Sequence, residues 1–304
     1  MLGAAMSWIE TYRGTVYRWE VDNVDHFTVA YYFARFEDAT AALLETVGLG
    51  RVSLAAAGQV AAVVESRVRY LKELRVADIL HMRSGVIEAD LRGLALGHEL
   101  YDSGSGALCT TVEERVVLAD AKTRAHLPMD AGVREAARAR VVSWPREPNP
   151  ASARSAPEGA TGFIDTARDA IKPWEVDAVG FAAPTAYIHR FSAANGHLLA
   201  GFGMTPAYMR QQQRGLSTFE FRLSFPGALR AGDFARVQSA LVHIGNSSMR
   251  IFHRMTDGRT NALVATLEQS GVHLDMAGRR PIPLPDDLRA RAKSLLVDGS
   301  GPGR

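Results

Sequence analysis

The residues Asp25-His26-Phe27-Thr28 place two titratable side chains directly before a long apolar segment. That segment, residues 28–49, is rich in Ala, Leu and Glu, contains no proline and repeats apolar residues at helical spacing, so we predict one buried helix. The first backbone N–H groups of a helix are unpaired and can bind a carbonyl oxygen. A histidine beside them can act as a general base toward water, and Asp25 could orient it or activate the water itself. The alternative is that Asp25 caps the helix and His26 is a polar loop residue.

The sequence repeats itself at a fixed offset of 155 residues. Residues 19–24 read WEVDNV, residues 174–179 read WEVDAV, and the match continues without a gap. We count 26 identities over the 105 positions from Val16 to Asp120, whereas random pairing gives about 6–7. The 304 residues are therefore two copies of one unit of roughly 120 residues.

The second copy of the loop before the helix has lost every titratable group. It reads Gly180-Phe181-Ala182-Ala183 and is followed by Pro184. One working site and one degenerate site are therefore predicted. Polar residues that both copies share are assigned to the fold instead, and these are Asp22/Asp177, Arg35/Arg190, Glu65/Glu220, Arg75/Arg230 and His98/His253.

The remaining segments of each copy read as strands. A short strand is expected at 14–21 and at 169–176, before the helix. After the helix, apolar and polar residues alternate, and short Gly/Ser/Asp segments separate the alternating stretches. In the first copy these stretches are 63–71, 77–90, 94–102 and 107–120. The predicted fold class is α+β, with two tandem units that each wrap an antiparallel sheet around a long central helix.

Composition marks the boundaries between the copies. Residues 1–128 form the predicted first unit and residues 161–296 the second. The segment 129–160 between them begins with the Ala/Arg-rich, helix-like AGVREAARARVV and continues with a Pro-, Ser- and Gly-rich stretch that is typical of a linker. Residues 297–304 are expected to be a disordered tail.

The junction WEVDNVDHFTVAYYFARFEDA resembles the strand–loop–helix segment of the hotdog acyl-CoA and acyl-ACP thioesterases. In the 4-hydroxybenzoyl-CoA thioesterase-like and acyl-ACP thioesterase families this segment runs D-x-N-x-H-[MV]-N-x-x-x-Y. The matching residues of this chain are Asp22, Val24, His26, Phe27, Thr28 and Tyr32. The resemblance implies a double-hotdog enzyme acting on an acyl thioester of CoA or of an acyl carrier protein. Because Val24 and Thr28 stand at the usual Asn positions, an amide-dependent mechanism is not carried over.

In paired hotdog units the site lies between the units, so the resemblance implies a contribution from the opposing helix. In that helix, expected at 191–204, Asn195 and His197 replace Thr40 and Ala42. Asn195 could hold the nucleophilic water or the thioester carbonyl, whereas His197 could instead face outward. His26, Asp25 and Asn195 are the predicted catalytic residues. The predicted substrate contacts are Thr28, Phe27, Tyr32 and His197.

Thioester hydrolysis is the favoured reaction, with His26 and Asp25 as base and helix N-terminal amides around the oxyanion. A second interpretation uses the same fold for hydration, dehydration or conjugate addition on an enoyl thioester, with His26 and Asn195 or His197 as partners. A third is a binding protein for acyl thioesters without catalytic activity.

Composition excludes several other classes. The net charge of +2 is too small to argue for nucleic acid, and the lone Cys109 excludes a disulfide framework and a multi-Cys metal site. There is no apolar stretch near the ~20 residues that cross a bilayer, which predicts a cytoplasmic protein without membrane contact. No metal or cofactor is expected beyond the CoA or phosphopantetheine of the substrate. The expected partners are acyl-CoA or acyl carrier protein, and the expected assembly is a monomer or homodimer.

Overall fold

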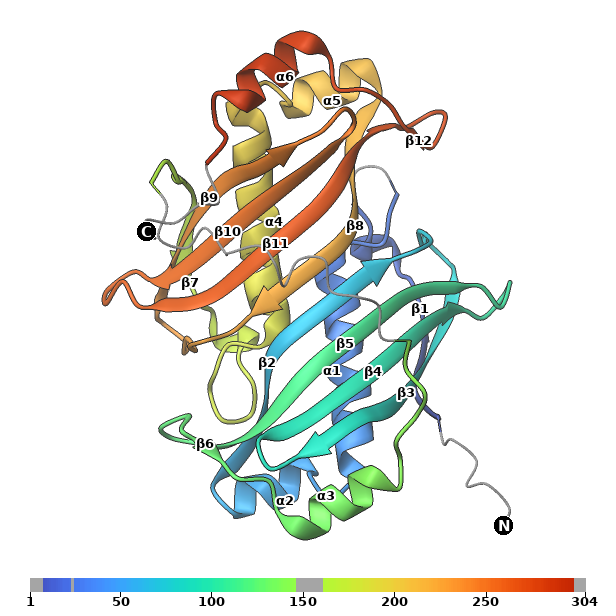
Figure 1. The fold of residues 1–304 in the computed structure, drawn as a ribbon, viewed down its shortest axis with the longest axis vertical. Coiled ribbons are helices and arrows are strands. Elements are labelled where there is room, and N and C mark those ends of the chain that lie inside the picture. Colours follow the sequence, from blue (N-terminus) through green and yellow to red (C-terminus); the bar gives the residue numbers. More distant parts are fainter. Residues whose placement is uncertain (1–7, 23–24, 146–160, 298–304) are drawn as a thin grey trace. The chain divides into compact units, whose positions relative to one another are not determined.

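The computed structural model describes residues 8–22, 25–145 and 161–297 (Figure 1). It divides the chain into two compact units, one of Met1–Arg146 with Asp177–Val179 and one of Glu147–Val176 with Gly180–Arg304. The same succession of elements occurs in both units, which confirms the tandem duplication. Val24, residues 146–160 of the expected linker and residues 298–304 of the expected tail lie outside the described residues.

Each unit contains one long helix and five long or medium strands. The elements of the first unit are β1 (Ile9–Thr15), η1 (Arg18–Glu20), α1 (Val29–Glu45), α2 (Arg51–Ala56), β2 (Gln59–Tyr70), β3 (Ile79–Asp90), β4 (Gly93–Asp102), β5 (Leu108–Asp120), β6 (His126–Leu127) and α3 (Ala131–Arg138). Those of the second are β7 (Ile164–Ala170), η2 (Pro173–Glu175), α4 (Pro184–Gly201), α5 (Pro206–Gln212), β8 (Arg214–Ser224), β9 (Phe234–Ile244), β10 (Ser248–Asp257), β11 (Leu263–Asp275), β12 (Arg280–Pro281) and α6 (Asp286–Lys293).

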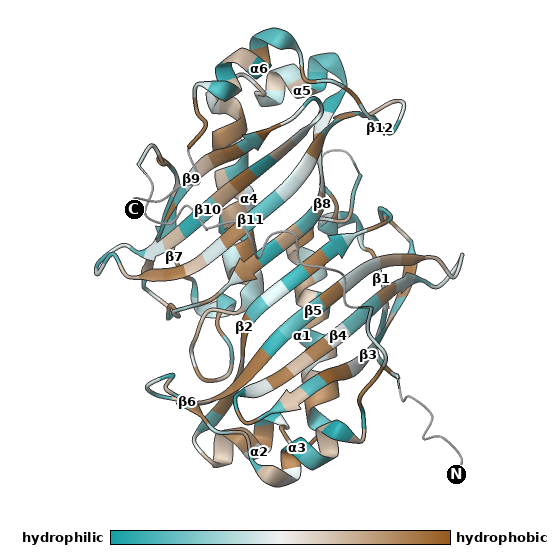
Figure 2. Ribbon diagram, viewed as in Figure 1, coloured by the Kyte–Doolittle hydropathy of each residue, from teal (hydrophilic) through white to brown (hydrophobic). Residues whose placement is uncertain are grey.

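The strands pair in the same antiparallel order in both units. The order is β1-β3-β4-β5-β2 in the first unit and β7-β9-β10-β11-β8 in the second. Figure 1 shows α1 and α4 each lying behind the strands of its own sheet. Hydrophilic and hydrophobic residues alternate along these strands in Figure 2, as expected for strands that bury one face against a helix. The predicted α+β class and the central helix are therefore confirmed.

The first strand of each unit lies earlier in the chain than predicted. The expected strands at 14–21 and 169–176 are wrong, because the WEV segments form the 3-10 turns η1 and η2. The reason is a local hydrogen bond that a strand could not make. The carboxylate of Glu20 accepts the backbone N–H of Tyr17 at 3.0 Å, and Glu175 accepts that of Lys172 at 2.7 Å.

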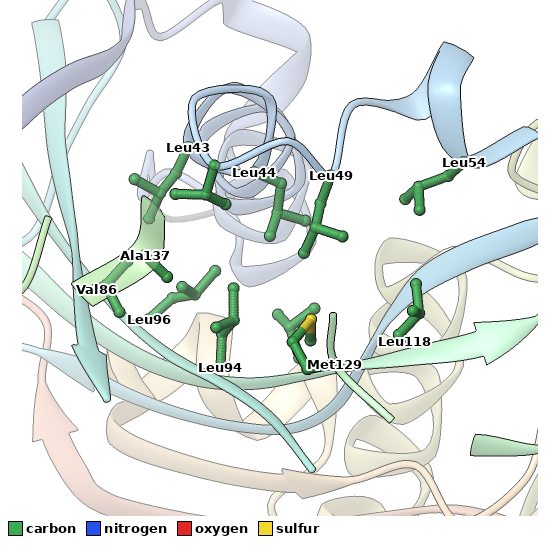
Figure 3. Close-up of a cluster of buried hydrophobic side chains, with 12 residues drawn as sticks. Leu43, Leu44, Leu49, Leu54, Val86, Leu94, Leu96, Leu118, Met129 and Ala137 are labelled. Carbon is green, nitrogen blue, oxygen red and sulfur yellow. The ribbon is translucent and has the colours of Figure 1, made fainter. Parts of the chain in front are cut away.

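Aliphatic side chains fill the space between the C-terminal half of α1 and the sheet (Figure 3). Leu43 and Leu44 of α1 point toward Leu94 and Leu96 of β4, and all four are at most 5% exposed. Helix α3 closes this cluster with Ala137, so part of the segment expected between the units packs on the first unit. Burying each leucine stabilises the fold by about 1.5–3 kcal/mol.

A row of polar side chains crosses the sheet of the first unit beneath the middle of α1. Its members come from all five long or medium strands and from the helix, and are Thr11, Ser84, His98, Thr40, Glu114 and Ser66. The Thr40 hydroxyl donates to Glu114 Oε2 at 2.6 Å and lies 3.1 Å from His98 Nε2. His98 Nδ1 lies 2.7 Å from the hydroxyl of Ser84. Thr11 in this first polar row is half-buried and the other members are buried, and the hydrogen bonds satisfy groups that would otherwise be costly inside a core.

The second unit repeats this row with changed members. The row consists of Thr166, Ser239, His253, Gln269 and Thr218, and Asn195 stands at the position of Thr40 in the sequence. Ser239 lies 2.6 Å from His253 Nδ1, and burial lowers the pKa of His253 to about 3, so the imidazole is neutral at neutral pH. Gln269 replaces the carboxylate of Glu114, and Asn195 replaces Thr40.

Candidate active site

Two backbone hydrogen bonds hold the loop before α1. The N–H of Phe27 donates to the carbonyl of Leu74 at 2.8 Å, and that of Thr28 donates to the carbonyl of Glu20 at 2.9 Å. Helix α1 then begins at Val29, with Thr28 as its N-cap. The loop therefore places His26 next to the positive end of the helix dipole.

His26 lies against a carboxylate that the sequence did not indicate. Its Nε2 is 2.8 Å from Glu73 Oε2, and its backbone N–H donates to Asp22 Oδ1 at 3.0 Å. Glu73 also accepts a hydrogen bond from Nε of Arg75 at 3.1 Å, so the carboxylate is fixed from its other side. A histidine held by a carboxylate in this way is oriented and stabilised when it takes up a proton.

The carboxylate of Asp25 has a different partner, Arg18. The two side chains form an ion pair at the surface, where Asp25 is 58% and Arg18 72% exposed. Asp25 has a φ of 60°, and Gly180 at the matching place in the second unit has a φ of 85°. Both loops therefore need a residue that tolerates the left-handed conformation, as aspartate and glycine do.

The first turn of α1 offers unused hydrogen-bond donors. Thr28 makes no side-chain cap, and within the described residues the N–H groups of Val29 and Ala30 have no acceptor. In the second unit Pro184 occupies the first helical position, where it has no N–H to offer. Of these two helix starts, only that of α1 therefore has two N–H groups that could donate to an oxyanion.

The loop of the second unit is apolar at each matching position. Phe181 stands where His26 does, Ala228 stands where Glu73 does, and the guanidinium of Arg230 covers the Phe181 ring at 3.8 Å from its centroid. The same backbone is thus built without an acid or a base. This difference between two otherwise similar units is the strongest indication that the loop polarity of the first unit serves chemistry.

Aromatic side chains lie behind the loop of the first unit. The ring of Phe27 is 4.5 Å from that of Tyr32, and the Tyr32 ring is 5.2 Å from that of Tyr70. Phe27 and Tyr32 are both buried, and burial raises the pKa of the Tyr32 hydroxyl, so it stays protonated. The predicted substrate contacts Phe27, Thr28 and Tyr32 therefore adjoin His26 within one unit.

Asn195 and His197 belong to the second unit, and each unit is described by itself. The Asn195 Oδ1 atom is buried and has no hydrogen-bond partner within the described residues, whereas the side chain of His197 is exposed. The matching residue of the first unit, Thr40, has both its partners in the first polar row. Asn195 thus has capacity for one further hydrogen bond.

Two carboxylates were not predicted from the sequence: Glu73, which lies beside His26, and Glu114, which lies in the first polar row. Glu73 is lost in the second unit together with His26, and this joint loss was a usable signal. Glu114 lies between Val112 and Val116 on the inward face of β5, so strict alternation placed its carboxylate inside the fold.

Two tandem units, each with a long helix wrapped by an antiparallel sheet, are the double-hotdog fold. The chain belongs to the thioesterase-like superfamily, whose family model matches residues 16–141 in the first unit and 171–292 in the second.

Solved structures of similar fold cover most of the chain. A protein described as an oleoyl thioesterase, from Lactobacillus plantarum, has a TM-score of 0.70 at 12% identity, covering 93% of this chain and 100% of that chain. The acyl-ACP thioesterase of Bacteroides thetaiotaomicron has a TM-score of 0.66 at 10% identity, covering 86% and 96%. The 12:0-ACP thioesterase of Umbellularia californica has a TM-score of 0.65 at 11% identity, covering 88% and 94%.

One curated relative is similar in sequence. The chain is 27% identical over 113 residues to the L-carnitine dehydrogenase/betainyl-CoA thioesterase of Rhizobium meliloti (strain 1021). This match covers 37% of the present chain and 23% of the relative, so the chain spans less than a quarter of that protein's length.

In the described part of the chain, no group of three or more His, Cys, Asp or Glu side chains is arranged to hold a metal ion. None of the described helices is long and apolar enough to cross a membrane.

Proposed function

We propose that the chain hydrolyses an acyl thioester of CoA or of an acyl carrier protein at the start of α1. The observation that carries this proposal is the pair of His26 and Glu73, 2.8 Å apart, beside the unpaired N–H groups of Val29 and Ala30. Family membership supports the thioester as the substrate class.

In the proposed reaction His26 takes a proton from water as the water attacks the thioester carbonyl. The negative charge that develops on the carbonyl oxygen is stabilised by the N–H groups of Val29 and Ala30 and by the helix dipole. Glu73 stabilises the imidazolium, which then returns its proton to the departing thiolate. The products are a free acid and a free thiol, and the reaction uses no cofactor beyond the CoA or phosphopantetheine of the substrate.

Asn195 belongs to the second unit, so its role in holding the attacking water stays a prediction from the sequence. Its unpartnered buried Oδ1 supports this role, because an amide oxygen in such a place gains from one more hydrogen bond. Asn195→Ala is the variant that tests this part separately. His197 is assigned at most an outer contact with the substrate, since its side chain is exposed.

Incubating the chain with saturated and 2-enoyl thioesters, each on CoA and on an acyl carrier protein, tests the reaction itself. The proposal expects a free thiol and a free acid from both acyl types, measured by thiol titration and mass spectrometry. A gain of water mass with the thioester intact would contradict hydrolysis and favour addition. Comparing the CoA and carrier-protein series identifies the natural carrier.

Two variants decide which carboxylate serves His26. Glu73→Gln removes the charge beside the imidazole and is expected to lower kcat about tenfold. Asp25→Asn changes a carboxylate that is paired with Arg18 at the surface, and is expected to change kcat by less than about twofold. Steady-state kinetics on one thioester makes the comparison. If Asp25→Asn lowered kcat more than Glu73→Gln, Asp25 would be the carboxylate that orients His26.

A further inference from the structure

Two aromatic side chains stack on the surface of the η1 turn, shortly before the loop that carries His26. The rings of Tyr17 and Trp19 are nearly parallel, at 4°, and their centroids are 4.6 Å apart. Tyr17 is nevertheless 46% exposed and Trp19 is 69% exposed. Because Tyr17 covers only one face of the indole, this exposure leaves the other face of Trp19 open to solvent. We call Tyr17 and Trp19 the aromatic platform.

The second unit builds the same turn without the stack. In η2, Lys172 and Trp174 stand where Tyr17 and Trp19 do in η1. Both turns are held by the same hydrogen bond, from the backbone N–H of the first of these residues to a glutamate carboxylate. Trp174 is 82% exposed, and the residue two places before it is not aromatic. The turn therefore forms without the aromatic platform, which is present only in the unit that carries His26.

A positive charge joins the aromatic platform to the loop. Arg18 stands between the two aromatic residues in the chain, its side chain is 72% exposed, and its Nη1 pairs with the carboxylate of Asp25, the neighbour of His26. The guanidinium has further N–H donors on Nη2 and Nε, which can bind an anion. In the second unit Pro173 and Gly180 replace this ion pair. The exposed cation, like the platform, therefore belongs to the first unit alone.

Backbone hydrogen bonds fix the distance from the platform to the start of α1. The N–H of Thr28, the N-cap of α1, donates to the carbonyl of Glu20 at 2.9 Å, and Glu20 directly follows Trp19. The Cα atoms of residues paired in this way are about 5 Å apart and those of consecutive residues about 3.8 Å apart. The backbone of Trp19 therefore lies within about 10 Å of the helix start, and the Trp19 side chain adds to this separation.

We propose that the aromatic platform and Arg18 bind the adenine nucleotide of CoA, so that the acyl group is carried by CoA and not by an acyl carrier protein. This inference rests on the proposed function and names the carrier at that site. Adenine is flat and stacks on the open face of the Trp19 indole, while Arg18 donates to the phosphate groups. The flexible pantetheine arm covers the separation from the platform to the start of α1. An acyl carrier protein presents that arm without an adenine ring and would leave the platform empty.

Calorimetric titration with adenosine 3′,5′-bisphosphate, the nucleotide part of CoA, tests the site without any reaction. Trp19→Ala is expected to weaken binding of the bisphosphate about tenfold, and Trp19→Phe, which keeps an aromatic face, is expected to weaken it less. Arg18→Gln is expected to weaken it about threefold, and less at high salt. Trp174→Ala is the matched control, because it removes an exposed tryptophan from the same place in the second unit and should leave the affinity unchanged.

Kinetics then compares the acyl-CoA that is turned over fastest with the same acyl group on pantetheine, which lacks the nucleotide. Trp19→Ala is expected to raise KM about tenfold for the acyl-CoA and to leave KM for the acyl-pantetheine unchanged. No binding of the bisphosphate to the wild type, an equal loss in Trp19→Ala and Trp174→Ala, or an equal rise in KM for both substrates would overturn the inference. If no thioester is hydrolysed, the proposed function fails while the titration still decides the nucleotide site.

Discussion

Replacing His26 by alanine is expected to lower kcat by about 10²–10⁴-fold while the chain stays folded. The imidazole of His26 is the proposed general base at the start of α1, and its Nε2 lies 2.8 Å from Glu73 Oε2. Without it, water would have to attack the thioester with its proton still bound. Thiol release under saturating substrate measures kcat, and the effect on KM is expected to be small because the lost contact is made in the transition state.

His126→Ala provides the control for this variant. His126 is an exposed histidine of β6, so its removal changes the histidine content without touching the loop. Circular dichroism and the melting temperature confirm that both variants are folded. Wild-type turnover in a folded His26→Ala variant would remove His26 from the mechanism.

Replacing Arg190 by leucine is expected to destabilise the second unit by about 3–5 kcal/mol. The side chain is 4% exposed, and its guanidinium donates to Asp169 Oδ1 at 2.6 Å and to Glu175 Oε2 at 2.8 Å. It also donates to the carbonyls of Ala186 and Ala170. These bonds join α4 to η2 and β7, and leucine would leave the acceptors without their donor. Urea unfolding at neutral pH measures the loss.

The cost should shrink as the pH falls. Burial alone would raise the pKa of Glu175, but the hydrogen bonds from Arg190 and from the Lys172 N–H hold it below its ordinary value. In the wild type this carboxylate therefore adds stability at neutral pH that is lost as the pH falls through its lowered pKa. In the Arg190→Leu variant the unpaired carboxylate gains from protonation, so acid stabilises the variant relative to the wild type.

Arg291→Leu is the matched control for this prediction. Arg291 pairs with Asp287 on exposed α6, where both side chains are more than half exposed, and such a pair contributes at most about 1 kcal/mol. A loss of similar size for Arg190→Leu and Arg291→Leu, or a loss that does not depend on pH, would contradict the role assigned to the buried arginine.

The sequence was sufficient for the fold because its signals are periodic. The offset of 155 defined two units, and the apolar residues of 28–49 recur at the spacing of a helix that buries one face. The turns η1 and η2 could not be predicted in this way. Each turn depends on one hydrogen bond in which the carboxylate of Glu20 or Glu175 accepts the backbone N–H three residues earlier, and the alternating pattern gives no sign of such a bond.

The loop was found from the sequence because the second copy lacks its polar groups. The partner of His26 was not found, because Glu73 is 73 − 26 = 47 residues away and lies in a segment without periodicity. Asp25 was predicted as the partner because it directly precedes His26 in the chain. The position that matches Glu73 in the second copy is Ala228, so the loss of Glu73 together with His26 was the signal in the sequence.

The first polar row sets the distance along the helix axis at which α1 begins. Thr40 lies 40 − 28 = 12 residues beyond Thr28, which is about 18 Å along a helix. A slide of α1 by one turn, about 5.4 Å, would carry Thr40 away from His98 and Glu114 and place it among leucines. The helix therefore has one axial setting on its sheet. Replacing Glu114, deep in the core, would therefore shift the start of α1 and displace the N–H groups of Val29 and Ala30. No reacting group would have been changed.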